Sequence, residues 1–511
     1  MRLIIILIFT VIVTSTSKKI LGIYSHPGKS HHIFGSIILR ELAKRGHEVT
    51  MVSAYPLKKP ISNYTDIYLD GFLEGLDDHD GVYLEMEKSP YHNMYYVLQM
   101  ISYFTSKTLS HPKIQQLVES GQNFDLIIMD SFCKDAELYF GHIFKAPIIL
   151  TASFGTQNFI NYILNNPEPA AYVPGSGTAF TDEMGFMERL ENVIYSWFIF
   201  ACLHYNAIQQ KRILRDYFGN VPSVDDLRSN IALVFVNSHP VFETPRPNLP
   251  NIVSVGGIHV EDAEPLPKDL QDYMDNSKEG VIFFSLGSHM KISVLPNETA
   301  LGIIRALSRL PQNVLLKWEL DQLPIVSDNI ITRKWFPQRS ILSHPNLKAI
   351  VTHGGLMTKI EAIHYGVPMV GIPLFGDQKN TVAHSVSEGI AIQIRLGELS
   401  EETLYNAITE IISNKSYQSN VEIRSEILRN QPMKPIDVAI YWSEHVMKFN
   451  GSKHLQNKGM RLYWFQNMLL DVTVFFAVVF GVISWLLIKS FLCIFRLLDG
   501  KGSTGKKMKT Q

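Results

Sequence analysis

Short apolar runs alternate with segments of helical spacing along the first part of the chain. Residues 20–24 form an apolar run that predicts a buried strand, and residues 25–30 predict a loop. The apolar spacing over residues 32–44 predicts an amphipathic helix that ends at a glycine. Further strands are expected at residues 48–52 and 126–129. This order of strand, helix and strand is typical of a parallel sheet.

The same alternation returns in the second half of the chain. Residues 280–286 and 314–318 predict two buried strands. Residues 349–351 end a third strand, and the turn Thr352-His353-Gly354-Gly355 leads into apolar helical spacing over residues 356–365. A final apolar run follows that helix. The pattern therefore predicts a second α/β domain, in addition to the first.

Four prolines crowd a short segment between the two patterned halves: Pro240, Pro245, Pro247 and Pro250. Prolines so closely spaced break regular structure and favour a linker. We therefore expect an N-terminal domain at residues 18–244, a linker at residues 245–258 and a C-terminal domain at residues 259–450.

Both ends of the chain carry membrane-related patterns. Residues 1–17 contain a basic residue, then an apolar run and then small residues, an order that is typical of a cleaved signal peptide. Near the C-terminus, an uncharged apolar stretch between an aspartate and a lysine predicts a transmembrane helix at residues 470–490. The tail at residues 491–511 is rich in lysine, so the positive-inside rule places it in the cytoplasm.

Charge and cysteine content narrow the class of protein further. The net charge is -1, which gives no argument for a nucleic-acid partner. The three cysteines, Cys133, Cys202 and Cys493, form neither a disulfide framework nor a paired metal motif. We expect Cys133 and Cys202 to be free buried thiols, although a bridge between them stays open.

The glycine turn at residues 352–355 has the features of a phosphate site. A glycine turn that opens a helix leaves backbone N–H groups free at the positive end of the helix dipole. His353 can add a hydrogen bond to a phosphate, and Glu361 on the helix can accept bonds from ribose hydroxyls. Asp377 and Gln378 follow the next strand, at the carboxyl edge where open α/β sheets bind ligands.

A second pair of polar residues follows two strands of the first half. His31 comes after the first strand and Asp130 ends the strand near residue 129, so a parallel sheet would bring both to one crevice. A carboxylate bonded to one imidazole nitrogen orients the ring, so that the other nitrogen can remove a proton from a hydroxyl. His26, His31 and His32 could suggest a metal site, but their loop spacing fixes no geometry and carboxylate partners are lacking nearby.

Together these motifs resemble the UDP-glycosyltransferase family, which includes the glucuronosyltransferases. The matching residues are Trp335, Pro337-Gln338, Thr352-His353-Gly354-Gly355, Glu361, Gly366-Val367-Pro368, Gly371-Ile372-Pro373 and Asp377-Gln378, with Ser30-His31 and Asp130 in the first half. The family usually has an aromatic residue directly after the histidine, where this chain has His32.

The resemblance implies an α/β fold of GT-B type, with two Rossmann-like domains facing each other across a cleft. It also implies that His31 is the general base and that Asp130 orients it. Residues that match the family's donor site are Ser285, Gly287, Ser288, Trp335, Gln338, His353, Gly355, Thr358, Glu361, Asp377 and Gln378. Trp335 would stack on the uracil ring and Gln338 would bond the ribose or base edge.

The expected reaction is inverting transfer of a glucosyl or glucuronosyl group from a UDP-sugar to a hydroxyl of a small lipophilic acceptor. The loop at residues 26–31 resembles the invertebrate branch of the family, in which glucose is the usual donor. The UDP-sugar is a co-substrate, and neither a cofactor nor a bound metal is expected.

The alternative is a non-catalytic, membrane-anchored protein that binds lipophiles or UDP-sugars. A homo-oligomer stays open.

Residues 143–200 have an irregular pattern and are rich in aromatic side chains. The apolar run 193–201 lies within the helical pattern of residues 188–209 and is too short to span a bilayer. It fits either a buried core helix or the wall of an acceptor pocket that rests against a membrane.

The two membrane patterns place the expected enzyme in the endoplasmic reticulum membrane, as a single-pass protein with a luminal catalytic body. A role in detoxification is the expectation for this family. A luminal body would expose four glycosylation sequons, which begin at Asn63, Asn297, Asn414 and Asn450.

Overall fold

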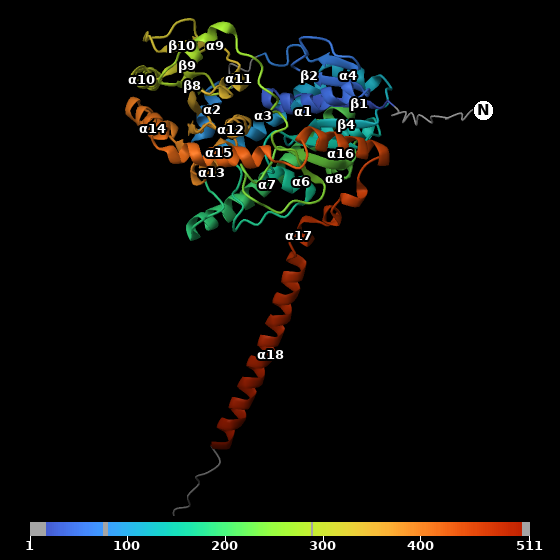
Figure 1. The fold of residues 1–511 in the computed structure, drawn as a ribbon. Coiled ribbons are helices and arrows are strands. Elements are labelled where there is room, and N and C mark those ends of the chain that lie inside the picture. The colour runs from blue at the N-terminus through green and yellow to red at the C-terminus, as the bar shows by residue number, and fades with distance from the viewer. Residues whose placement is uncertain (1–16, 75–79, 288–289, 503–511) are drawn as a thin grey trace, which may run out of the picture. The chain divides into compact units, whose positions relative to one another are not determined.

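The computed structural model describes residues 17–74, 80–287 and 290–502. Most of the predicted signal peptide, Ser288 and the end of the basic tail lie outside these residues. The described chain divides into two compact units, one up to Gln456 and one from Asn457 onward. The first unit contains two parallel sheets with helices on their faces (Figure 1).

The first sheet has seven strands among the described residues, and all of its strand pairs are parallel. In spatial order they are β3 (Tyr64–Tyr68), β2 (Glu48–Ser53), β1 (Lys19–Tyr24), β4 (Leu126–Asp130), β5 (Ile148–Ala152), β6 (Ile231–Val236) and β7 (Ile252–Ser254). The order reverses between β1 and β4, which are paired with Ile23 beside Met129. The ends of these two strands therefore lie at a switch point, where doubly wound sheets bind ligands.

The second sheet has six strands in the described part of the chain, again paired in parallel. In spatial order they are β10 (Ile330–Arg333), β9 (Asn313–Lys317), β8 (Val281–Ser285), β11 (Leu347–Thr352), β12 (Met369–Gly371) and β13 (Ala391–Gln393). Its order reverses between β8 and β11, where Ser285 pairs with Thr352. The glycine turn that follows β11 thus also lies at a switch point.

Helices cover both sheets. Those of the first half are α1 (Lys29–Lys44), α2 (Asp80–Glu87), α3 (Pro90–Ser110), α4 (Pro112–Glu119), α5 (Tyr139–Ile143), α6 (Asn158–Leu164), α7 (Phe186–Phe218) and α8 (Val224–Arg228). Those of the second half are α9 (Lys268–Asp275), α10 (Asn297–Ser308), α11 (Gln338–Leu342), α12 (Leu356–His364), α13 (Gln378–Ser387), α14 (Glu401–Ser413), α15 (Lys415–Arg429) and α16 (Pro435–Phe449). We call residues 17–254 the N-terminal lobe and residues 268–429 the C-terminal lobe.

The interval expected as a linker contains a strand. The interval 245–258, expected as a linker, contains β7, which completes the first sheet beside β6. The chain crosses to the second lobe after β7. Near its end it crosses back, because Ala439 and Ile440 of α16 share a buried apolar cluster with Ile38 and Leu42 of α1. Since the lobes form one compact unit, the domain limits at 244 and 259 stay predictions.

The expectation that residues 143–200 are irregular is wrong at β5, whereas the helical pattern at residues 188–209 lies within a longer helix, α7. β5 is a buried central strand of the first sheet, and α7 is a continuous helix of 33 residues. α7 is not simply a core helix, since it buries a stripe that includes Tyr195 and Ile199 and exposes Trp197. Because apolar side chains lie on both its buried and its exposed faces, the sequence of α7 lacks the apolar periodicity of an ordinary amphipathic helix.

The first helix also starts earlier than predicted. α1 begins at Lys29 rather than at residue 32, after Gly28 in an extended conformation. His31 therefore lies in the first turn of the helix, and its backbone N–H bonds the carbonyl of Gly28 at 3.1 Å.

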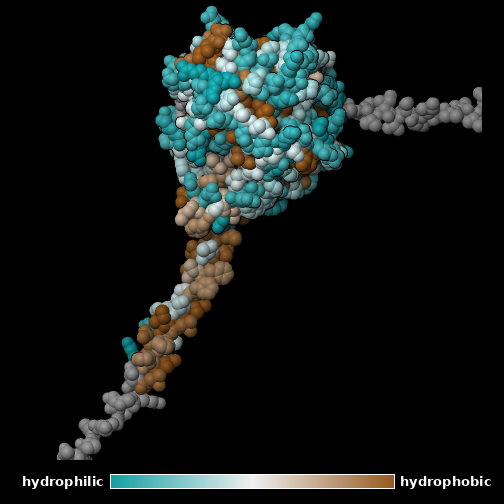
Figure 2. All heavy atoms as spheres, turned by 60° about the vertical axis from the view of Figure 1, so that its left-hand side comes forward, coloured by the Kyte–Doolittle hydropathy of each residue, from teal (hydrophilic) through white to brown (hydrophobic). Residues whose placement is uncertain are grey.

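The second unit consists of α17 (Trp464–Asn467), α18 (Leu470–Gly502) and short connecting turns. α18 contains an apolar span from Leu470 to Leu498, long enough and apolar enough to cross a membrane. Figure 2 shows this helix with a largely hydrophobic surface. The span runs beyond residue 490, so the start of the predicted tail is still helical and apolar.

Candidate active site

A cleft of about 800 Å³ lies between the carboxyl ends of the two sheets. Both lobes line it. The predicted residues that face it are His31, Ser285, Gly287, Trp335, Gln338, His353, Gly355, Thr358, Glu361, Asp377 and Gln378. Asp130 lies directly behind His31, and Ser288 is outside the described residues. Residues predicted from separate motifs in both halves of the sequence therefore meet at one site.

His31 and Asp130 form a direct contact at the end of the first sheet. The Nδ1 atom of His31 lies 2.8 Å from Oδ1 of Asp130. Both side chains are nearly buried, with 10% and 1% of their surfaces exposed. Phe132 and Phe154 pack edge-on against the imidazole and hold its plane. The polar contact and the aromatic packing thus fix the ring while it faces the cleft.

His32 occupies a different environment from its neighbour. Its ring packs near Tyr55 with centroids 5.3 Å apart, and it does not line the cleft. Burial lowers the pKa of His32 to about 4. Of the two adjacent histidines, His31 is therefore the one placed to meet a substrate.

His26 stacks on the face of His31, with ring centroids 4.3 Å apart. Polar atoms of His26, His31 and Asp130 lie within 4.8 Å of one another, so the expectation that carboxylate partners are lacking near these histidines is wrong. Two stacked rings direct their in-plane lone pairs side by side instead of toward one point. His26 Nδ1 also accepts the N–H of Gly28 at 2.8 Å. This arrangement favours ring positioning over metal binding, and the expectation that no metal binds stays a prediction.

The glycine turn after β11 has the shape expected for an anion site. Gly354 has a φ of +78°, and a Cβ there would lie 2.2 Å from Val382. Gly355 precedes α12 in an extended conformation, so the first N–H groups of that helix face the cleft. Gly287 packs against the imidazole of His353 from the neighbouring strand end. His353 is thereby held beside the helix N-terminus.

Trp335 lies at the outer part of the cleft with 58% of its surface exposed. The ammonium group of Lys29 lies 3.8 Å from the centroid of its ring. Burial, followed by the charges of Lys58 and Lys317, lowers the pKa of Lys29. An exposed indole beside a cation is a suitable platform for a planar, anionic ligand. No local pattern marks Lys29 in the sequence, because the contact joins residues of different lobes.

Gln338 and Glu361 are bonded to each other. Gln338 Nε2 donates to Glu361 Oε2 at 2.6 Å and to Thr358 Oγ1 at 3.2 Å. Burial raises the pKa of Glu361 to about 7. The two residues therefore form one polar unit, with its free edges directed into the cleft.

Asp377 and Gln378 lie at the start of α13 but serve different parts of the site. Gln378 Oε1 accepts the backbone N–H groups of Leu374 and Phe375 at 2.9 and 3.1 Å, so this side chain braces the loop that precedes the helix. Desolvation raises the pKa of Asp377 to about 6, and the charge of His31 acts in the opposite direction. Asp377 therefore lies close enough to the His31–Asp130 pair to interact with it electrostatically.

The far wall of the cleft is apolar and comes from α3, α6, α7 and the ends of β4 and β5. It includes Met94, Phe104, Phe132, Phe159 and Ile199. This wall suits a lipophilic molecule. The sequence offered such a wall only as one of two interpretations of residues 193–201, of which Tyr195 and Ile199 line the cleft. The wall residues outside that run follow no local motif.

The four predicted glycosylation sites lie on the surface. Asn63, Asn297, Asn414 and Asn450 are all exposed. Cys133, Cys202 and Cys493 are free thiols within the described structure. Burial raises the pKa of Cys133 well above its usual value, so this thiol is held in its neutral form.

Two parallel sheets with a ligand cleft at their facing switch points define a glycosyltransferase of GT-B type. Solved structures with this architecture include a glycosyltransferase of kitacinnamycin, with a TM-score of 0.57 and 17% identity over 84% of this chain and 99% of that one. A UDP-glucosyltransferase from Polygonum tinctorium gives a TM-score of 0.57 at 16% identity, covering 86% of this chain and 99% of that one.

The sequence comparison identifies the family. The chain belongs to the family described as UDP-glucoronosyl and UDP-glucosyl transferase, which matches residues 22–505. It is 34% identical to UDP-glucosyltransferase 2 of Dactylopius coccus, over 94% of both chains. It is 33% identical to the human UDP-glucuronosyltransferase 2B15, again over 94% of both chains. The protein is therefore a glycosyltransferase that uses a UDP-sugar.

Proposed function

We propose that this enzyme transfers a hexosyl group from a UDP-sugar to a hydroxyl of a small lipophilic acceptor, with His31 as the general base. The observation that carries this proposal is the contact between His31 and Asp130 at the same cleft as the donor residues. A purely binding protein has no need of an oriented imidazole beside its ligand.

The donor fits along the C-terminal side of the cleft. Trp335 stacks on the uracil ring, and the unit of Gln338 and Glu361 bonds the ribose. The diphosphate meets the N-terminus of α12 at Gly355, together with His353. The sugar then lies between the phosphates and His31, beside Asp377, which lines the same cleft.

The chemistry follows from this order along the cleft. The Nδ1–H group of His31 donates a hydrogen bond to Asp130. Nε2 is then unprotonated and can take the proton of the acceptor hydroxyl. The acceptor oxygen attacks the anomeric carbon while the bond to UDP breaks on the opposite side, so the configuration inverts. The helix N-terminus and His353 stabilise the negative charge that develops on the leaving phosphate.

Glucose is the donor sugar that we favour. The loop His26-Pro27-Gly28-Lys29-Ser30-His31 resembles the invertebrate branch of the family, in which glucose is the usual donor. A relative named UDP-glucosyltransferase 2 is 34% identical to this chain. The apolar wall of α3 and α7 supports a flat or flexible lipophile as acceptor, consistent with a role in detoxification.

We place the enzyme in the endoplasmic reticulum membrane as a single-pass protein. The span from Leu470 to Leu498 supports one crossing, and the basic residues after it support a cytoplasmic C-terminus by the positive-inside rule. The catalytic body is then luminal, where the four exposed sequons are accessible for glycosylation.

The decisive experiment incubates membranes that carry the full chain with UDP-glucose or UDP-glucuronate and a panel of phenols. Conjugate formation is measured for the wild type, His31→Ala and His32→Ala. We expect conjugation from one donor, a loss of at least about 100-fold in His31→Ala, and near wild-type turnover in His32→Ala.

Each other result has a distinct meaning. Full activity in His31→Ala overturns the assignment of the base. UDP binding without any conjugate from either donor favours the non-catalytic binding protein or an acceptor outside the panel. Conjugation from UDP-glucuronate alone overturns the choice of glucose and leaves the mechanism intact.

A further inference from the structure

Contacts from the N-terminal lobe converge on one short segment of the C-terminal lobe, residues 376–380. The side chain of Asn93, in the first turn of α3, accepts the backbone N–H of Gly376 through Oδ1 at 3.1 Å. Lys379 Nζ donates to the carbonyl of Glu87 at the end of α2. The segment held in this way contains Asp377, the carboxylate placed beside the transferred sugar.

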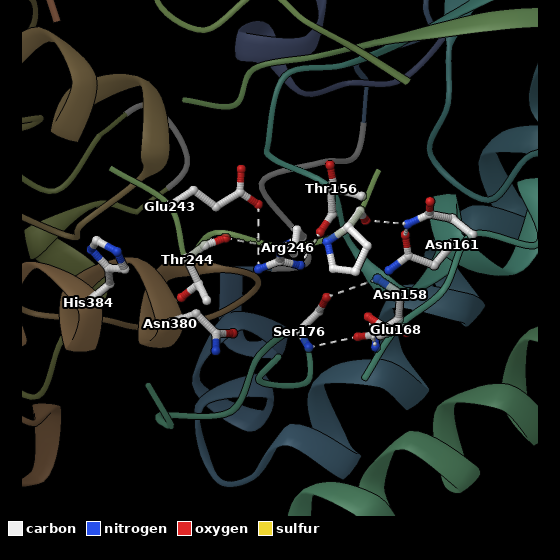
Figure 3. Close-up of polar contacts among 12 residues, drawn as sticks. Thr156, Asn158, Asn161, Glu168, Ser176, Glu243, Thr244, Arg246, Asn380 and His384 are labelled. Carbon is white, nitrogen blue, oxygen red and sulfur yellow. Dashed lines mark hydrogen bonds and ion pairs between the residues drawn. The ribbon is translucent and has the colours of Figure 1, made fainter. Parts of the chain in front are cut away.

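A third contact comes from a loop of the N-terminal lobe. Asn380 Oδ1 accepts the N–H of Gly177 at 2.6 Å. The loop is itself fixed, since Ser176 N–H donates to Asn158 Oδ1 at 2.7 Å. Figure 3 shows Asn380 beside Ser176, with Ser176 bonded to Asn158. The donor segment is therefore bonded to a rigid part of the opposite lobe.

The packing around Gly177 is tight, whereas a Cβ at Gly376 would meet no atom within 4 Å. Gly177 has a φ of +86°, and a Cβ there would lie 3.0 Å from Asn93 Nδ2 and 3.3 Å from the carbonyl of Gly376. Gly376 also has a positive φ, of +65°. A glycine has many accessible conformations, so the bond to Asn93 restrains a position that is intrinsically free.

Three successive backbone N–H groups before Asp377 have hydrogen-bond acceptors in different lobes. Those of Leu374 and Phe375 bond Gln378 of the same lobe, whereas that of Gly376 crosses the cleft to Asn93. Asp377 follows directly and has space on both sides, because it lines the main cleft and a smaller cavity of about 70 Å³. The direction of its carboxylate therefore depends on the backbone before it.

We propose that Asn93 is a positioning residue for the donor sugar, an inference that rests on the proposed function. The hydrogen bond between Asn93 and Gly376 directs the Asp377 carboxylate toward the sugar. Asn93 also lines the acceptor side of the cleft beside Met94 and Val97. It thereby connects the wall that binds the acceptor with the segment that holds the sugar, and Asn380 supports the same segment from the other end.

The test compares two ligands on the full-length protein in detergent: UDP, and the UDP-sugar that the wild type uses. Their dissociation constants are measured calorimetrically for the wild type, Asn93→Ala and Asn380→Ala, together with donor KM and kcat with a phenol acceptor. Asn276→Ala is the matched control, because it removes an exposed asparagine at the end of α9, whose Nδ2 bonds Asp272 far from the donor segment.

We expect both variants to weaken UDP-sugar binding and to raise donor KM about 5- to 30-fold, while the UDP dissociation constant changes less than about twofold. The control leaves all of these values unchanged. A general structural role would weaken UDP and UDP-sugar together, and that result overturns the proposal, as does unchanged UDP-sugar binding in both variants. Should Asn93→Ala fail to fold, Asn380→Ala decides by the same measurements.

Failure of the proposed function looks different. In that case the wild type forms no conjugate from either donor, whatever the variants do. An active wild type in which Asn93→Ala and Asn380→Ala bind the UDP-sugar normally refutes the role of Asn93 and leaves the transfer reaction in place.

Discussion

Nδ1 of His31 lies 2.8 Å from Oδ1 of Asp130, although 99 residues separate them in the chain. The contact exists because β1 and β4 are neighbours in a parallel sheet, so the residues at their carboxyl ends share one edge. With 1% of its side chain exposed, Asp130 is well placed to fix the imidazole and to stabilise its protonated form.

The first prediction concerns this carboxylate. Asp130→Asn should lower kcat about 100- to 10,000-fold and change donor KM little, because an amide neither stabilises the imidazolium nor enforces the same tautomer. Initial rates with saturating donor and acceptor measure the effect.

Asp125→Asn provides the matched control. Asp125 precedes the same strand at its other end and pairs with Lys18 at 2.9 Å, away from the cleft. This variant should keep the wild-type kcat. Equal loss of turnover in both variants would show that Asp130 acts through stability instead of chemistry.

The parts of the site that the sequence predicted well are those built from local pattern. The turn before α12 and the helix itself follow from glycines and apolar spacing within about 15 residues. The pairing of His31 with Asp130 needed one further step, the parallel order of two strands. Each of these inferences used short-range periodicity and a general rule of sheet topology.

The parts that the sequence did not predict depend on contacts between distant segments. Asn93 and Gly376 are 283 residues apart, and nothing in the sequence around Asn93 marks it. β7 was hidden within a proline-rich interval because its three residues are too few to show a period. The mixed surface of α7 likewise follows from tertiary packing and not from local spacing.

The second prediction uses the fluorescence of Trp335. UDP should quench it, because the uracil ring stacks on the exposed indole. Trp335→Phe should abolish this response, and Trp335→Ala should raise the UDP dissociation constant about 5- to 100-fold. Titration of the full chain with UDP measures both. Trp197→Phe, at an exposed position of α7, is the control and should retain the quenching; loss of quenching there instead would place the uracil elsewhere.

The third prediction concerns the glycine beside His353. Gly287 has a φ of +80°, and a Cβ there would lie 2.5 Å from Cε1 of His353. Gly287→Ala should therefore displace the imidazole and cost about 1–2 kcal/mol in backbone strain. Donor KM should rise and the melting temperature should fall.

Gly397→Ala is a suitable comparison for this substitution. A Cβ at Gly397 would have no neighbouring atom within 4 Å, and the backbone there has no positive φ. Neither donor KM nor the melting temperature should change. An unaltered donor KM in Gly287→Ala would exclude His353 from the donor site as we have placed it.

The fourth prediction is a pH dependence set by Glu361. Burial raises the pKa of its carboxyl from 4.5 to about 7, so the folded protein binds this proton more tightly than the unfolded chain does. Stability therefore falls as the pH rises from about 4.5 to about 7 and then levels off. The full penalty above pH 7 is about 3 kcal/mol for such a shift.

Glu361→Gln removes this titration and retains an oxygen that can accept the bond from Gln338. The melting temperature of the variant relative to the wild type should therefore rise between about pH 4.5 and 7 and stay constant above about pH 7. Thermal unfolding across this range measures the trend, with Glu422→Gln as a control at an exposed carboxyl.

If Glu361 binds the ribose as a carboxylate, the wild type should also bind UDP more tightly as the pH rises through this range, and the Gln variant should not. A difference in melting temperature that is independent of pH would show that Glu361 is ionised in the folded protein throughout, despite its burial.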